Sequence, residues 1–365
     1  MGGLPRLFLV IIFGAAAASW VVEAQPQARF KCSSEGKTCR SLVDYSSPNE
    51  TTLGHIQKLF NLKHVLDIVG ANAFPSTTRG NRTVGKGQII KIPFQCRCAN
   101  GTGLSNKTPL YTIRKDDTLS HIAMGVFSGL VTYQQLQALN NIPDATLIQP
   151  GQKVWIPLPC SCDQVDATDA VHYGHLVARG SSFQQIALQY GTTQDALLDL
   201  NNISDPKSLQ AGQIIDVPLK ACSSSTVKND SLDYPLLVAK GMDTYTANGC
   251  VKCSCNNAAD NATLQCEPSQ VKPYKWDTCP SMLCGNSTIG NVTSAASCTR
   301  TICAYAGYNN QTISTALSNE STCSAPTGSG ASRNSLQGWG WNHLLMPLYF
   351  LFCLSFLVNS NATCP

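Results

Sequence analysis

The sequence predicts an α+β protein in which three small modules, each ordered strand, helix, helix, strand, precede a Cys-rich disulfide module. The first observation is a repeated strand ending at Gly87–Pro93, Gly151–Pro157 and Gly212–Pro218, with spacings of 64 and 61 residues. Such a period indicates one supersecondary unit copied along the chain. The second observation is the helical pattern before these endings, and the third is the crowding of ten cysteines into Cys222–Cys323.

The N-terminal segment is typical of a secretory signal. Arg6 supplies the positive charge, Leu7–Ala18 the apolar stretch, and Val22–Ala24 a small-residue cleavage site. The apolar stretch is too short to span a membrane comfortably. We therefore expect residues 1–24 to be removed, with the mature protein starting near Gln25.

Cysteine and sequon usage agree with export. Of the 18 cysteines, 16 lie before the C-terminal tail, and an even number is typical of a disulfide-bonded secreted protein. Asn-x-Ser/Thr sequons predict a glycosylated surface. They begin at Asn49, Asn81, Asn100, Asn106, Asn202, Asn229, Asn261, Asn286, Asn291, Asn310 and Asn319, with a further one at Asn361 in the tail.

Charged residues make up only 13% of the sequence and are scattered along it, which argues against a nucleic-acid partner.

The middle copy shows the predicted elements most clearly. Alternation of Tyr111 and Ile113 predicts a strand with one buried face. Asp117 and Thr118 offer N-cap oxygens to a helix that starts with the apolar positions of Leu119–Ala123.

A second helix and a closing strand complete this copy. Thr132 and Gln135 form a capping-box pattern, and Leu139–Ile142 ends the helix because Asn tolerates the left-handed conformation. The closing strand is Gly151–Pro157.

The other two copies repeat this order. In the third copy, Ser181 and Ser182 offer the first cap, Thr192–Asp195 resembles a capping box, and Leu200–Ile203 ends the second helix. In the first copy Thr52–Ile56 matches Thr118–Ile122, whereas Ser76–Val84 reads as a polar loop insertion.

The middle unit resembles a LysM domain, because D-T-L-x-x-I-A, L-N-N-I and P-G-Q-x-x-x-I-P follow one another in family order. We place module 1, a degenerate copy, at 44–94, module 2 at 110–158 and module 3 at 174–219. The resemblance implies two helices on one face of a two-stranded sheet. It also implies N-acetylglucosamine polymers, such as chitin and peptidoglycan, as ligands.

Cysteines flank the modules as C-x-C pairs, which cannot easily bridge within the pair. In plant LysM receptors such cysteines staple three modules into one block. That resemblance implies the pairs Cys32–Cys98, Cys39–Cys162 and Cys96–Cys160. A zinc site is disfavoured because no histidines stand at ligand spacing and the compartment oxidises thiols. We expect neither a metal nor a cofactor.

The family groove lies between the first strand–helix loop and the loop after the second helix. On module 2 these loops contain Lys115, Asp116, Asp117, Thr118 and Leu119, and Ala145, Thr146, Leu147 and Ile148. We expect the main contacts at Asp117, Thr118, Leu147 and Ile148. Structural roles compete with this, since Asp117 and Thr118 could cap a helix and Leu147 could belong to the core. All three modules have a possible groove.

The segment Cys222–Cys323 is predicted to be a separate module with five bridges if fully paired, in a connectivity that the sequence leaves open. Cys250 and Cys253 form a C-x-x-C pattern, but no thioredoxin-like strand and helix surround it, so we expect structural bridges.

The C-terminal region resembles a glycosylphosphatidylinositol (GPI) attachment signal. Small residues surround Ser329 or Gly330 as the attachment residue, within a stalk at 324–343, and Leu344–Val358 forms the hydrophobic tail of a propeptide at 344–365. A transmembrane helix is the alternative. It is disfavoured because Pro347 interrupts fifteen residues, fewer than the ~20 that a span needs.

This layout resembles plant LysM domain-containing GPI-anchored proteins. The resemblance implies a receptor on the extracellular face of the plasma membrane that binds peptidoglycan and/or chitin oligomers and triggers innate immunity without catalysis. A LysM receptor kinase would be its signalling partner, and ligand could induce a homo-oligomer. The alternatives are a secreted wall hydrolase, which would need two carboxylates facing one sugar, and a passive wall-binding protein.

Overall fold

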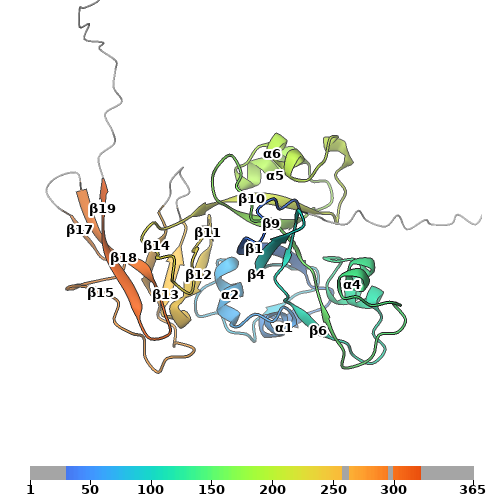
Figure 1. Cartoon of the computed structure of the whole chain (residues 1–365), viewed down its shortest axis with the longest axis horizontal. Coiled ribbons are helices and arrows are strands. Elements are labelled where there is room, and N and C mark those ends of the chain that lie inside the picture. The colour runs from blue at the N-terminus through green and yellow to red at the C-terminus, as the bar shows by residue number, and fades with distance from the viewer. Residues whose placement is uncertain (1–29, 257–262, 295–298, 322–365) are drawn as a thin grey trace, which may run out of the picture. The chain divides into compact units, whose positions relative to one another are not determined.

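The structure is a computed structural model that describes residues 30–256, 263–294 and 299–321 (Figure 1). All three modules have the predicted order of strand, helix, helix and strand. Module 1 contains β1 (Thr38–Ser46), β2 (Thr51–Thr52), α1 (Leu53–Leu59), α2 (Val65–Ala71), β3 (Thr83–Val84) and β4 (Ile89–Ala99).

Modules 2 and 3 follow. Module 2 contains β6 (Leu110–Thr112), α3 (Leu119–His121) with a π-helical continuation (Ile122–Val126), α4 (Tyr133–Leu139) and β7 (Lys153–Trp155). Module 3 contains β9 (Ala170–Leu176), α5 (Phe183–Tyr190), α6 (Gln194–Leu200), a 3-10 turn (Pro206–Ser208) and β10 (Ile214–Cys222). The linking strands β5 (Thr102–Ser105) and β8 (Pro159–Cys160) lie between modules.

The Cys-rich module is made of short strands. They are β11 (Val238–Ala239), β12 (Asp243–Thr246), β13 (Val251–Ser254), β14 (Gln265–Pro268), β15 (Leu283–Cys284), β16 (Ser287–Thr288), β17 (Val292–Ser294), β18 (Thr299–Tyr308) and β19 (Ile313–Ser321), with a 3-10 turn at Ala247–Gly249.

Modules 1 and 3 share one sheet, which differs from the expectation of a two-stranded sheet in each module. The seven strands are ordered β11-β10-β9-β1-β4-β5-β8, and β1 pairs in parallel with β9 through Leu42 and Tyr173. This pairing covers strand edges that would otherwise stay open to other chains. Module 2 keeps its own two-stranded sheet of β6 and β7.

The helix caps follow the local sequence with one exception. Thr118, Thr132 and Ser182 are N-caps, and the last two form capping boxes with Gln135 and Gln185. The prediction of a cap at Thr192 is wrong, because its N–H donates to the Ala187 carbonyl (3.0 Å) and so closes α5. Thr193 caps α6 instead, accepting from the Ala196 N–H (3.1 Å).

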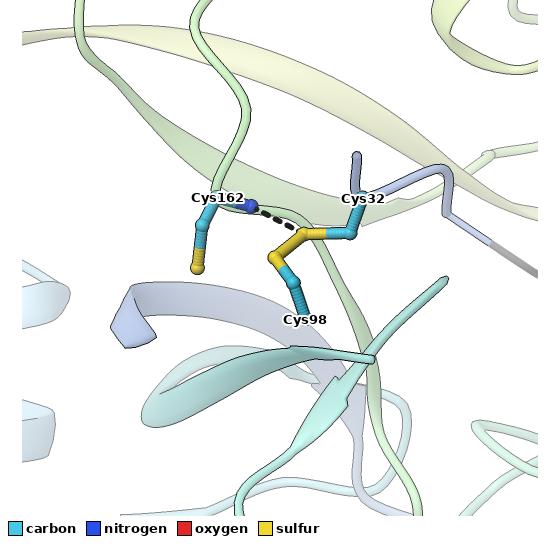
Figure 2. Close-up of side chains that lie close together, drawn as sticks. All are labelled: Cys32, Cys98 and Cys162. Atoms are coloured by element: carbon cyan, nitrogen blue, oxygen red, sulfur yellow. Dashed lines mark hydrogen bonds between the residues drawn. A yellow bond between two sulfur atoms is a disulfide. The ribbon is translucent and has the colours of Figure 1, made fainter. Parts of the chain in front are cut away.

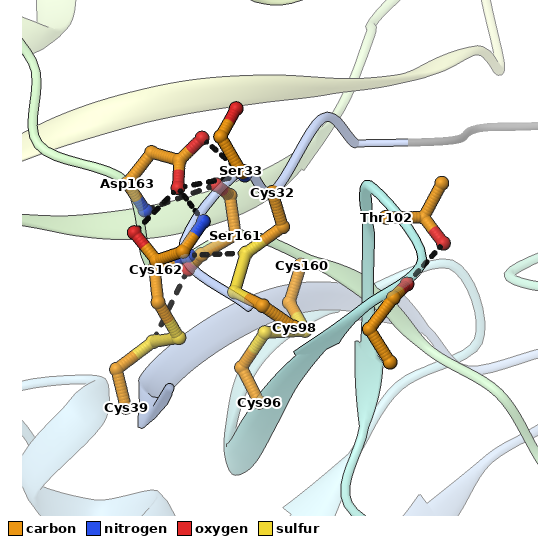
Figure 3. The surroundings of a disulfide bond; sticks show 12 residues. Cys32, Ser33, Cys39, Cys96, Cys98, Thr102, Cys160, Ser161, Cys162 and Asp163 are labelled. Atoms are coloured by element: carbon orange, nitrogen blue, oxygen red, sulfur yellow. Dashed lines mark hydrogen bonds between the residues drawn. A yellow bond between two sulfur atoms is a disulfide. The ribbon is translucent and has the colours of Figure 1, made fainter. Parts of the chain in front are cut away.

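Disulfides staple the modules as the family resemblance implies. Cys39 bonds Cys162 across 123 residues of sequence, Cys96 bonds Cys160, and Cys32 bonds Cys98 (Figure 3). In the Cys-rich module the pairs are Cys222–Cys255, Cys250–Cys279, Cys253–Cys266 and Cys284–Cys303. Cys250 and Cys253 therefore bridge elsewhere, as expected for structural cysteines. Cys298 and Cys323 lie outside the described residues.

The Cys-rich module packs on α2 of module 1. Gly70 lies so close to β12 that an added Cβ would stand 2.4 Å from the Asp243 carbonyl oxygen. The His64 ring stacks on Tyr274, with centroids 3.3 Å apart. Leu66, Val69 and Tyr245 are buried together in this contact.

Several expectations fall outside the described residues, namely the signal segment 1–24, Asn261, the attachment residues Ser329 and Gly330, and the tail 344–365. Within the described ranges, every helix is too short or too polar to span a membrane.

Candidate functional site

Backbone pairing brings the two predicted loops of module 2 together. The N–H of Ile113 donates to the Gln152 carbonyl (2.9 Å), and the N–H of Gly151 donates to the Ile113 carbonyl (2.8 Å). These bonds extend the antiparallel β6–β7 pair past its last ladder residues. The start of the Lys115–Leu119 loop therefore lies beside the end of the loop that contains Ala145–Ile148.

The first loop is held by Asp117. Its carboxylate accepts hydrogen bonds from the Arg114 N–H (2.7 Å) and the Tyr111 hydroxyl (2.9 Å), and its side chain is only 7% exposed. Burial, together with the neighbouring Asp117 carboxylate, raises the pKa of Tyr111 to about 12. Tyr111 thus stays a hydrogen-bond donor at neutral pH, and Asp117 fixes the shape of the loop.

The other first-loop residues divide between surface and core. Lys115 and Asp116 are exposed, and Asp116 has a left-handed φ of 66° at the tip of the turn. Thr118 is exposed and accepts from the His121 N–H (3.0 Å) as the helix cap. Leu119 is placed differently from the expectation, because its side chain is 1% exposed and packs in the core. A ligand could reach only its backbone.

The second loop presents one apolar side chain to solvent. Asp144 accepts from the N–H and the hydroxyl of Thr146, both at 2.8 Å, and these bonds lower the pKa of Asp144. Ala145 and Ile148 pack partly against the core that contains Leu119. Leu147 is 65% exposed, so it is not a core residue. An exposed leucine on a loop with a fixed backbone is available for contact with a ligand.

A glutamine and an asparagine that recur in every module also shape this site. The sequence predicted only a helix stop for the asparagine and no role for the glutamine. The Gln152 side chain accepts from the Gln149 N–H (3.2 Å), which closes the turn before β7, and Gln88 and Gln213 do the same in modules 1 and 3. Asn140, interpreted as a helix stop, also bonds the backbone of the closing strand at Trp155. Recurrence at the same place in each copy is the signal that could have identified both.

In module 1 the two corresponding loops are hydrogen-bonded to each other. β2 pairs with β3 through Thr51–Val84 and Thr52–Thr83. The N–H groups of Leu53 and Gly54 then donate to the carbonyls of Arg82 (3.0 Å) and Gly80 (2.7 Å). The predicted polar insertion therefore fills the space between the loops of module 1.

In module 3 the loops lack an exposed apolar side chain at the position of Leu147. Counting back from the glycine of each strand ending, Ser208 corresponds to Leu147, and Thr83 does so in module 1. Ser208 is exposed, and its hydroxyl donates to the Asp205 carbonyl (2.7 Å). Among the described residues, the two loops of module 2 lack the loop–loop hydrogen bonds of module 1. Module 2 also has an exposed leucine that module 3 lacks at this position.

Sulfur atoms gather where the modules are stapled together. The Cys162 N–H donates to the Cys32 sulfur (3.0 Å), beside the Cys32–Cys98 bond (Figure 2). All three sulfurs are used in disulfides, and a disulfide sulfur lacks the thiolate charge of a metal ligand. This cluster is therefore structural.

Comparison with known proteins identifies modules 2 and 3 as LysM domains. The LysM domain model matches residues 111–157 and 175–218. LysM domain-containing GPI-anchored protein 2 of Arabidopsis thaliana is 48% identical over 299 residues, covering 81% of this chain and 84% of that protein. Chitin elicitor-binding protein of Oryza sativa subsp. japonica is 40% identical over 319 residues, covering 86% of this chain and 87% of that protein.

Among solved structures, the ectodomain of a receptor-like kinase aligns with a TM-score of 0.42 and 23% identity, covering 51% of this chain and 93% of that one. The relatives at 48% and 40% identity cover most of both chains. The chain therefore belongs to the family of LysM domain-containing GPI-anchored proteins.

Proposed function

We propose that this protein is a cell-surface receptor that binds N-acetylglucosamine-containing glycans without cutting them. A relative 40% identical over 86% of this chain is named for binding a chitin elicitor. Bacterial peptidoglycan shares the N-acetylglucosamine unit and is the second candidate ligand. Recognition of either glycan would serve innate immunity.

The observation that carries the proposal is the exposed Leu147 on the second loop of module 2. An N-acetyl group needs an amide donor, an amide acceptor and a small apolar surface for its methyl group. The loops offer backbone groups for the first two, and Leu147 offers the third. Module 1 is unsuited because its own loops are bonded together, and module 3 because Ser208 replaces the leucine.

The same family membership supports a proposal on attachment and signalling. We propose a GPI lipid at Ser329 or Gly330 that holds the protein on the extracellular face of the plasma membrane. A LysM receptor kinase would carry the signal inward. A glycan long enough to contact two copies could also assemble a homo-oligomer, because linked sites bind with a high effective concentration.

Leu147→Ser tests the site by calorimetry of the glycosylated ectodomain against chitin oligomers and muropeptides of graded length. Burying a leucine is worth roughly 1.5–3 kcal/mol, so we expect affinity to fall about tenfold or more. Leu188→Ser is the matched control, since Leu188 is 77% exposed on α5, away from the loops. It should bind as the unaltered protein does.

Equal affinity of the Leu147→Ser and Leu188→Ser variants would move the site away from module 2. Absence of heat with every glycan would end the proposal altogether. Release of soluble sugars from chitin or peptidoglycan by the purified ectodomain would instead support a wall hydrolase.

A further inference from the structure

The Cys-rich module contains a cleft that the proposed receptor function does not use. Its volume is about 680 Å³, within the range typical of small-ligand sites. One side is lined by β14 and the adjoining part of β13, and the other by β18 and the turn between β16 and β17.

The lining of this cleft suits a neutral, hydroxyl-rich ligand. Ten of the lining side chains carry a hydroxyl or an amide, whereas three carry a charge. Among the charged groups, the Lys252 ammonium already lies 3.1 Å from Asp243 and 3.9 Å from Glu267. Val292, Ile302 and Pro268 give the cleft apolar surface that is at least partly exposed. Hydroxyls together with apolar surface match the two kinds of face that a sugar ring presents.

A sequon asparagine stands in this lining. Asn291 begins Asn-Val-Thr and is exposed. Its N–H donates to the Thr288 carbonyl (3.0 Å), and its carbonyl accepts from the Cys303 N–H (3.2 Å), so the attachment point is fixed. Among the sequon asparagines in the described ranges, Asn291 alone lines the cleft.

The turn before Asn291 is held close to β14. Gly290 has a φ of 86°, and an added Cβ would lie 2.9 Å from the Cys266 carbonyl oxygen. Only glycine fits this approach without strain. The turn therefore places the exposed sequon beside β14 at the rim of the cleft.

We propose that Asn291 carries an N-linked glycan whose inner N-acetylglucosamine units lie in this cleft. The occupant of the cleft is thus part of the protein itself. The bound sugars cover Val292 and Ile302 and hold the β12–β14 sheet against the β17–β19 sheet. This inference is independent of glycan binding by module 2.

Native digestion of the glycoprotein with an endoglycosidase tests the proposal, with release followed at each site by mass spectrometry. We expect the Asn291 glycan to resist release until the protein is denatured, while the glycan at Asn310, on the exposed turn between β18 and β19, is released in the native state. Release of both at the same rate, or an unmodified Asn291, would overturn the proposal.

Two sequon variants provide a second measurement. Asn291→Gln and Thr293→Ala each remove the glycan by a different change, and both are expected to lower the melting temperature by several degrees. Asn310→Gln is the control and should leave the melting temperature unchanged. Melting temperatures of the Asn291→Gln and Thr293→Ala proteins equal to that of the control would also overturn the proposal.

Discussion

His172 and Asp216 form a buried pair where β9 meets β10. The His172 Nδ1 lies 2.9 Å from both carboxylate oxygens, and its Nε2 lies 2.8 Å from the Asp163 carbonyl. Both side chains are fully buried. Burial lowers the pKa of His172, but the Asp216 charge and the hydrogen bonds outweigh it, so the pKa is raised above 6.5. The imidazolium form is therefore favoured in the folded protein.

This pair predicts a pH dependence of stability. Because the folded pKa is raised, the stabilisation is fully present below pH 6.5 and is lost as pH rises through the folded pKa. His172→Gln should lower the free energy of unfolding at pH 5 by about 3–5 kcal/mol and flatten its decline at higher pH. Chemical denaturation between pH 5 and 9 measures this, with the exposed His55→Gln as control. An unchanged pH slope in His172→Gln would contradict the account.

Some features of single residues can be predicted from the sequence, and others cannot. The cap at Thr118 is predictable, because a cap needs only a side-chain oxygen and an amide three residues later. Leu119 starts the apolar face of a predicted helix, and its exposure of 1% agrees with that spacing. The 65% exposure of Leu147 is not predictable, because it depends on how the second loop packs, which the local pattern does not contain.

At the scale of elements, an asparagine joins the second helix of each module to its closing strand. Asn140 donates to the carbonyls of Leu136 and Trp155, both at 2.9 Å, and accepts from the Trp155 N–H (2.8 Å). Asn72 makes the same three kinds of bond, one to the Ile68 carbonyl and two to the Lys91 backbone. Asn201 makes them to the Leu197 carbonyl and the Asp216 backbone. The helix end and the strand edge thereby satisfy each other.

Asn140→Ala should lower the free energy of unfolding by about 1–3 kcal/mol, because it leaves partly buried backbone groups without partners. Asn140→Asp keeps the acceptor but loses both donated bonds, so an intermediate or equal loss is expected. Urea denaturation measures both, with the exposed Gln134→Ala on the same helix as control. A loss in Asn140→Ala no larger than the control's would show that the bonds are dispensable.

Elements also differ in how well the sequence predicts them. The order strand, helix, helix, strand is predictable because each segment shows its own periodicity and caps. The parallel pairing of β1 with β9 is not, because Leu42 and Tyr173 come from different modules and no local signal connects them. The pairing of β2 with β3 is likewise not predictable, since the sequence of Ser76–Val84 indicates only a polar insertion.

At the scale of the whole molecule, three disulfides and a shared sheet hold the modules in one block. Small modules have too little core to be stable alone, so staples of this kind are expected. Within this block, modules 1 and 2 differ in what they contact. Module 1 contacts the Cys-rich module through α2 and His64, while module 2 contains the loops that we propose as the glycan site.

Hydrogen exchange of the glycosylated ectodomain, with and without a saturating chitin oligomer, tests the central claim most directly. We predict slower exchange in residues 114–120 and 144–152 of module 2 when the oligomer is bound. Residues 51–56 and 80–88 of module 1 should be unchanged, because these two segments are already hydrogen-bonded to each other through β2, β3, Leu53 and Gly54. Protection confined to module 1 or module 3, or no protection in any module, would contradict the account.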